Sequence, residues 1–277
     1  MTAELKLSQL TSHLAELREV LTQHRRYIVL PAAAVVGYLL FRDCIQDIRD
    51  QYFAWTYVTH FLDGINKELK PFREKLKEQL SKQPSHDPRP HNDTTLRILE
   101  IGMGSGTNLD FYPKSSRVVG VEPNPYFVDM LLQQQKSHPE FVRVIRGYAE
   151  DLFDIQDESI DAVVSTLVLC SVRNLDKALQ EIRRVLVKGG RFYFFEHERD
   201  HVDRRRYLTQ LIASPFLRLI FNNCSVSRDI YAGLMRSGFQ VGERTSFLSD
   251  TDHRCVVFIL CVSNRMRFLV LFQIGTQ

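Results

Sequence analysis

The chain has 277 residues, of which 44% are hydrophobic and 25% charged, which is ordinary for a globular protein with an ample core. Its formal net charge is +3, from 36 basic and 33 acidic residues, and no basic stripe is interleaved with aromatic side chains. This balance argues against a nucleic-acid partner. The five cysteines are scattered, and none stands in CxxC spacing. We therefore expect reduced thiols, with neither a disulfide framework nor a metal site.

The first 80 residues form a helical region with an apolar segment inside it. Leucines recur at spacings of three and four, as on one face of a helix, at Leu7, Leu10, Leu14, Leu17 and Leu21. Residues 27–41 carry no charge, but as a helix they span only about 22 Å, less than the roughly 30 Å of a bilayer core. From the residues alone, 27–41 is a buried helix, an anchor lying on a membrane or a short span.

A charged segment and a proline-rich segment follow. Residues 67–82 predict a charged, solvated helix. Residues 81–95 are polar and rich in proline without periodicity, which is typical of a linker. We therefore place a domain boundary at 81–95, between an N-terminal region, 1–80, and a second domain, 96–265. The tail, 266–277, receives no interpretation from its sequence.

Beyond the linker, short apolar runs alternate with helical patterns. Strands are expected at 96–102, 117–123, 141–147, 159–169 and 191–197. Helices are expected at 124–137 and at 174–190, where Gly189 and Gly190 stop the second helix, and a closing pair of strands at 238–247 and 255–262. This alternation predicts an α/β fold with a Rossmann-like, doubly wound, mostly parallel sheet.

The stretch RILEIGMGSGTNLDFYP, residues 97–113, places three glycines at alternate positions after the first expected strand: Gly102, Gly104 and Gly106. Glycine loses more backbone entropy on folding than any other residue, so stability does not explain them. They let the main chain turn sharply and approach a ligand closely. Doubly wound sheets bind ligands at the carboxyl ends of their strands, where these glycines are expected.

The spacing of the acidic residue and the glycines indicates which ligand binds. A nicotinamide fingerprint reads GxGxxG, whereas here one residue separates Gly104 from Gly106 and Glu100 precedes the first glycine by two. This form resembles the first motif of class I S-adenosylmethionine-dependent methyltransferases. That cofactor has no pyrophosphate, but it has a cationic amino-acid end that a carboxylate binds. The resemblance implies S-adenosylmethionine as cofactor and Glu100, Gly102, Gly104, Gly106, Glu122 (at the ribose), Glu150 or Asp151 (at the adenine) and Thr166 as its binding residues.

A closer resemblance rests on four segments: GSGTNLDFYPKSSRVVGVEPNPYF, STLVLCSVRN, EIRRVLVKGGRFYFFEH and LRLIFNNCSVSRDIYAGLMRSGF. Together they resemble the methyltransferase-like protein 7 family of membrane-associated alkyl-thiol methyltransferases, over residues 49–262. The resemblance implies a hydrophobic anchor at 27–41, association with the endoplasmic reticulum or lipid droplets and a cytosolic catalytic domain. The chain departs from the family in its 26-residue extension before the anchor, in Met103 where a cysteine is common, and in its tail.

The resemblance implies transfer of a methyl group to a small lipophilic acceptor, in the first place an alkyl thiol. Transfer to an oxygen or carbon of a quinone or sterol, and a non-catalytic membrane-tethered module of the same fold, are the alternatives. His197, at the end of the fifth strand, is the candidate catalytic base, with a structural histidine as the alternative. Cys170 and Cys224 are interpreted as structural. The apolar segment 207–221 and the aromatic segment 52–61 are expected to cover the acceptor.

Overall fold

The computed structural model describes residues 3–23, 25–85, 95–241, 244–248 and 267–275. The chain divides into two compact units, residues 1–49 and 50–277. The predicted linker falls largely on residues 86–94, which lie outside the described part. The helix before it, α3 (Leu62–Lys82), belongs to the same unit as the sheet.

The first unit contains α1 (Ala3–Gln23) and most of α2 (Arg25–Thr56). The leucine stripe therefore lies on a helix, as predicted, and the uncharged run 27–41 continues α2 through Pro31. Several of its apolar side chains are exposed: Tyr27, Val35, Val36, Tyr38, Leu39, Leu40 and Phe41. Within the described residues, no helix combines the length and the apolar character needed to cross a bilayer.

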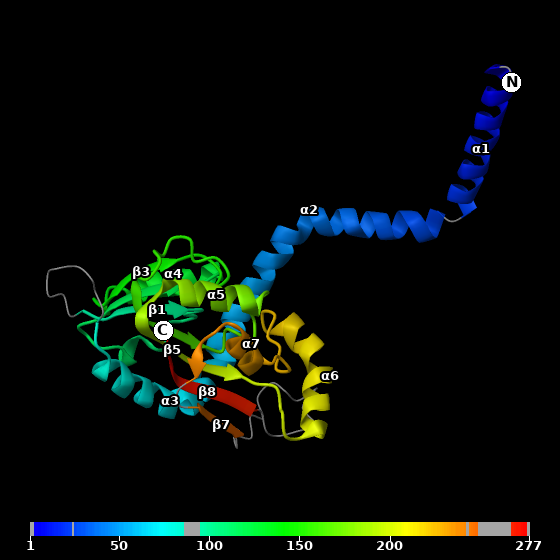
Figure 1. Ribbon diagram of the computed structural model, residues 1–277. Helices are drawn as coiled ribbons and strands as arrows, with labels where there is room; N and C mark the ends of the chain where they lie inside the picture. The colour runs from blue at the N-terminus through cyan, green and yellow to red at the C-terminus, as the bar shows by residue number, and fades with distance from the viewer. Residues whose placement is uncertain (1–2, 24, 86–94, 242–243, 249–266, 276–277) are drawn as a thin grey trace. The chain divides into compact units, whose positions relative to one another are not determined.

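The second unit is built on one sheet, which confirms the predicted α/β fold (Figure 1). Its parallel strands are β1 (Arg97–Ile101), β2 (Arg117–Val121), β3 (Phe141–Ile145), β4 (Ile160–Thr166) and β5 (Leu186–His197), in the order β3-β2-β1-β4-β5. The strand β8 (Arg267–Gly275) pairs antiparallel with β5 and is itself paired by β6 (Gln240–Val241) and β7 (Arg244–Leu248). The order reverses at β1, so the turn after β1 lies at the position where such sheets bind ligands.

Two predicted boundaries need correction. Helix α5 (Leu175–Val185) ends before the expected glycine stop, because Leu186 and Val187 are buried and β5 already begins there, with Leu186 paired to Ile160. The second correction concerns the end of the predicted domain at residue 265. The strand β8, which pairs with β5, comes from the tail, 266–277, which received no interpretation from its sequence. The expected strand 255–262 lies outside the described residues.

Alternate residues along each strand pack on opposite faces of the sheet. One face carries α5 and α7 (Ile230–Arg236), together with part of α6 (Arg204–Ile220). The other face carries α3 and α4 (Pro125–Gln134). The prediction of a solvated helix at 67–82 was therefore wrong for one side of α3, which buries Leu69, Phe72, Arg73, Leu76 and Leu80.

Candidate cofactor and acceptor site

The three glycines after β1 form the turn that the sequence predicts, because all three have positive φ, at 62°, 54° and 79°. A Cβ atom at Gly102 would lie 2.3 Å from Val168 Cγ2, and one at Gly106 would lie 2.8 Å from Gln134 Oε1. A Cβ atom at Gly104 would meet nothing within 4 Å. Gly102 and Gly106 are thus required by packing, whereas Gly104 borders open space that a ligand can enter.

The carboxylate of Glu122, directly after β2, holds this turn. Its Oε2 accepts the Gly104 N–H at 2.8 Å and its Oε1 accepts the Asn124 N–H at 2.9 Å. Asn124 in turn caps α4, because its side chain accepts the Tyr126 N–H. Burial raises the pKa of Glu122 to about 7. The carboxylate oxygens keep lone pairs for further donors, as binding of ribose hydroxyls requires.

Glu100 lies on β1, buried on the face that carries α3. Its two oxygens accept hydrogen bonds from Asn108 Nδ2 and from the Tyr112 hydroxyl, both at 2.7 Å. Burial raises the pKa of Glu100 to about 7. The same Asn108 nitrogen donates to Thr166 Oγ1 at the end of β4, at 3.1 Å. One network therefore brings together two of the predicted cofactor residues, Glu100 and Thr166.

Sequence reasoning missed Arg73. This arginine of α3 donates to Asn108 Oδ1, Thr107 Oγ1 and Asn66 Oδ1, each at 2.7 Å. Its side chain is buried, so α3 fixes the segment that follows the glycine turn. An arginine within a charged helix looks solvated, and the apolar periodicity of α3 was the only sequence signal that its face is covered.

Aromatic residues also adjoin the network. Tyr57 begins the π-helical turn η1 (Tyr57–Phe61), and burial raises its pKa to about 12. Val58, the next residue of this turn, lines a hollow together with Ser105, Gly106 and Thr107. The predicted aromatic segment thus lies at the cofactor turn.

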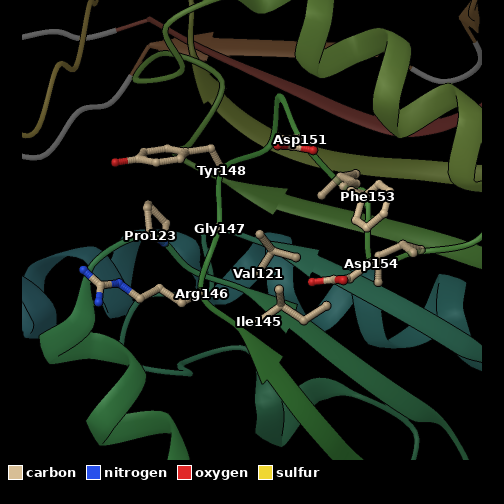
Figure 2. A pocket seen from close by; sticks show the side chains of 11 residues that line it. Val121, Pro123, Ile145, Arg146, Gly147, Tyr148, Asp151, Phe153 and Asp154 are labelled. Atoms are coloured by element: carbon tan, nitrogen blue, oxygen red, sulfur yellow. The ribbon is translucent and has the colours of Figure 1, made fainter.

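A cleft of about 440 Å³ opens beside the end of Glu122's strand (Figure 2). The paired residues Val121 and Ile145 lie on β2 and β3, and Figure 2 shows Pro123, Tyr148 and Phe153 around the same hollow. Its walls combine apolar side chains with a few polar groups, as small-molecule and cofactor sites do.

The structure separates the two acidic residues predicted at the adenine. Asp151 lines the cleft. Glu150 is buried, and its Oε1 accepts the N–H groups of Arg173 at 2.5 Å and Asn174 at 3.1 Å. Asp151 is therefore the better placed of the two, and Glu150 holds the loop before α5.

His197 ends β5, as predicted, but its neighbours were not foreseen. Its Nδ1 lies 3.5 Å from Cys170 Sγ and 3.5 Å from Cys224 Sγ, and the two sulfurs are 3.6 Å apart. A hydrogen bond with Cys224, together with burial, raises the pKa of the Cys170 thiol. Burial opposes protonation of His197, but contacts with Cys170 and the charge of Glu196 outweigh burial and raise its pKa. We expected no metal site because the cysteines are not closely spaced along the sequence. The fold nevertheless brings these three side chains together.

The glycine turn, the Glu122 carboxylate and the adjacent cleft fit S-adenosylmethionine. Open space at Gly104 lets the ligand approach the backbone, the Glu122 carboxylate has lone pairs available to the ribose, and the cleft has apolar walls for the base. On this fold, such a site defines a class I S-adenosylmethionine-dependent methyltransferase.

Comparisons with known proteins specify the family. Residues 99–194 match the family described as "Methyltransferase domain". Human thiol S-methyltransferase TMT1A is 38% identical over 146 residues, which cover 52% of this chain and 60% of that protein. Rat thiol S-methyltransferase TMT1B is 32% identical over 223 residues, covering 80% and 88%. The crystal structure of Bacillus subtilis YcgJ has a TM-score of 0.57 at 14% identity, covering 74% of this chain and 98% of that one, and shows the fold alone.

The chain belongs to the family of the thiol S-methyltransferases TMT1A and TMT1B, and its cofactor is S-adenosylmethionine. This finding confirms the resemblance identified from the sequence motifs.

Substituting the glycines separately distinguishes packing from ligand binding. We expect Gly104→Ala to weaken binding of S-adenosylhomocysteine by about tenfold or more, because the added methyl group enters the open space that the ligand would occupy. The positive φ at this position adds a backbone cost of about 1–2 kcal/mol to the folded state. Gly102→Ala should lower the melting temperature more than Gly104→Ala does, since it adds a collision of its Cβ with Val168 to the same kind of backbone cost. Calorimetry and thermal circular dichroism measure the two effects. Gly37→Ala, where space is also open but φ is not positive, is the control. Unchanged affinity in Gly104→Ala would contradict the site.

The buried Glu122 predicts a pH dependence of stability in the cofactor-free chain. A carboxyl whose pKa rises from 4.5 to about 7 on folding stabilises the fold below pH about 4.5 and loses that contribution as the pH rises through about 7. The full effect is about 3 kcal/mol. Glu122→Gln removes this pH-dependent contribution. In urea titrations, the free energy of unfolding of the variant minus that of wild type should therefore increase from pH 5 to pH 8.

The control for this pH dependence is Glu78→Gln on the surface of α3. A hydrogen bond from Lys82 lowers the pKa of Glu78, so this group stays ionised across the interval and the variant should show no such change. An equal pH dependence in both variants would show that Glu122 is not the group responsible.

Proposed function

We propose that this protein transfers the methyl group of S-adenosylmethionine to the sulfur of a small lipophilic thiol. The observation that carries the proposal is the position of the loop after β4. Val168 of this loop packs against Gly102 of the cofactor turn, and Cys170, two residues further, contacts His197. We therefore infer that the acceptor binds on this side of the cofactor turn. The thiol specificity of TMT1A and TMT1B, as their names state it, supports the choice of acceptor.

Apolar groups cover the acceptor side of this loop. Phe61 of η1 and Phe221, which follows α6, meet edge to face with ring centroids 5.4 Å apart. They come from the two segments, 52–61 and 207–221, that the sequence predicts as the cover. The Cys224 N–H donates to the Phe221 carbonyl, which joins this cover to the thiol cluster. An apolar cover excludes water and favours an apolar acceptor.

The chain's residues have three tasks in this reaction. When bound, S-adenosylmethionine supplies a methyl group on a sulfonium sulfur, which leaves as a neutral thioether. The turn and Glu122 orient the cofactor, and the aromatic cover aligns the acceptor and keeps out water. The acceptor sulfur forms the new bond to the methyl carbon and gives up one proton, because the thiolate is the nucleophile. His197, the predicted catalytic base, is the candidate to receive that proton.

We propose in addition that the protein works at a membrane surface, on the endoplasmic reticulum or on lipid droplets. The uncharged run 27–41 supports this proposal, because its described side chains are largely exposed. A second apolar surface supports it independently. Helix α6 exposes Leu208, Leu211, Ile212, Phe216 and Leu219. Their spacings of one, three and four residues place them on one broad stripe of the helix.

Purified full-length protein, given labelled S-adenosylmethionine and matched acceptors, tests the reaction. We expect a methyl thioether from a small alkyl thiol and no product from a phenol, a quinone or a sterol of similar size. Product from an oxygen or carbon acceptor without any from a thiol would replace the proposal with the second candidate function. Calorimetry that detects no binding of S-adenosylhomocysteine would favour the non-catalytic module.

Carbonate extraction of fractionated cells tests the membrane proposal. Wild-type chain should stay in the membrane fraction, and the double variant Leu40→Glu, Phe41→Glu should shift to the supernatant, because charged side chains oppose burial in the bilayer. Thr22→Glu, at an exposed position of α1 outside the apolar run, is the control. Equal extraction of all three proteins would contradict an anchor at 27–41.

A further inference from the structure

Three side chains of metal-ligand type lie together although they come from distant parts of the chain. Cys170 follows β4, His197 ends β5, and Cys224 lies in the loop between α6 and α7. Each offers one ligand atom, and the three separations are 3.5, 3.5 and 3.6 Å. Tetrahedral zinc, with bonds of about 2.3 Å to sulfur and 2.0–2.1 Å to nitrogen, separates two sulfurs by about 3.8 Å and a sulfur from a nitrogen by about 3.6 Å. The cluster therefore has the dimensions of a zinc site already.

Charge and ligand type agree with these dimensions. Cys170 is fully buried and Cys224 is 8% exposed. Two thiolates and one divalent cation have no net charge, so the occupied cluster avoids the cost of burying an unpaired ion. Thiolate and imidazole are the ligands that zinc prefers, and neither suits magnesium or calcium.

A single carboxylate holds the loop that carries Cys170. Glu196, next to His197 on β5, accepts the N–H groups of Val168, Leu169 and Cys170 at 2.8, 2.7 and 3.2 Å. The same side chain thus fixes one candidate ligand relative to the next. Groups behind the ligands have this orienting role in metal sites.

The loop that carries Cys224 is attached to the Cys170 loop. The Ser225 N–H donates to the Cys170 carbonyl at 3.0 Å, and Asn223 Nδ2 donates to the Ser171 carbonyl at 2.9 Å. Backbone strain marks both loops, since Leu167 and Asn223 have positive φ, at 59° and 71°. Such strain persists where the surroundings fix a conformation, as at functional sites. The three ligand atoms are therefore held in place before any ion binds.

We propose that Cys170, His197 and Cys224 bind one Zn²⁺ and leave its fourth coordination position to the acceptor. Binding of the ion displaces the two cysteine protons to solvent. An acceptor thiol that takes the fourth position loses its proton in the same way and becomes a thiolate beside the cofactor turn. In this arrangement His197 is a zinc ligand and not the base that receives the proton. The zinc ion, and not the imidazole, promotes loss of the proton by lowering the pKa of the acceptor thiol. This role of the ion rests on the proposed function, whereas the metal site itself does not.

Metal binding is measured on the reduced full-length chain, without cofactor or acceptor. After removal of bound metal, Zn²⁺ in competition with a chromophoric chelator should bind at one ion per chain. Co²⁺ in its place should give the thiolate charge-transfer band and the strong visible bands of a tetrahedral site. Cys170→Ser, Cys224→Ser and His197→Gln should each weaken zinc binding by more than about 100-fold, since even groups behind the ligands contribute 10–100-fold. Cys44→Ser, at an exposed cysteine of α2, should bind as wild type does.

Wild-type protein that binds no zinc, or whose cobalt form lacks thiolate charge transfer, would overturn the site even if a variant fails to fold. So would a native Cys170–Cys224 disulfide found by peptide mapping under non-reducing conditions, because it removes both thiolates. Zinc bound at one per chain without thiol methylation would refute the proposed function and leave the site standing. Thiol methylation by metal-free protein would refute the ion's role in the reaction.

Discussion

The hydrogen bond from the Gly104 N–H to the Glu122 carboxylate is the contact on which the cofactor site depends. It joins the turn after β1, the strand at which the sheet order reverses, to the end of the neighbouring strand β2. A side chain at Gly102 or Gly106 would displace the turn, so the packing on either side fixes the N–H group that Glu122 accepts. The cleft lined by Val121 and Pro123 lies directly beside Glu122, the residue that accepts this hydrogen bond.

A buried carboxylate that accepts hydrogen bonds from the site occurs at or near the ends of three strands. Glu100 on β1 accepts from Asn108 and Tyr112, Glu122 accepts from two backbone N–H groups, and Glu196 on β5 accepts from three. All three carboxylates are buried, and burial raises the pKa of each. Burying a carboxylate is unfavourable unless it accepts hydrogen bonds, and here each one accepts them from the loop or side chains that complete the site. These hydrogen bonds attach the loops of the site to the sheet.

Sequence reasoning succeeded where the signal is local. The periodicity of each parallel strand and the spacing of Gly102, Gly104 and Gly106 are properties of a few consecutive residues, and the fold and the cofactor turn follow from them. It failed where a contact joins distant residues. Arg73 reaches Asn108 across 35 positions, and Cys170, His197 and Cys224 stand 27 positions apart in succession, so no window of the sequence contains either arrangement. The early start of β5 has the same origin, since Leu186 extends the strand only because Ile160 lies beside it.

The cofactor side and the proposed acceptor side of the site are built from different kinds of structure. This difference explains why the sequence motifs indicate the cofactor more directly than the acceptor. The cofactor side consists of strand ends and one turn, whose geometry the sheet imposes on every member of the fold class. The acceptor side, as we propose it, consists of the loop after β4, the end of β5 and the segment after α6, which meet through tertiary contacts such as the Phe61–Phe221 pair. Loops tolerate replacement without loss of the sheet, so acceptor chemistry varies on a constant cofactor site. In this chain the side chains that these loops bring together are two thiols and an imidazole.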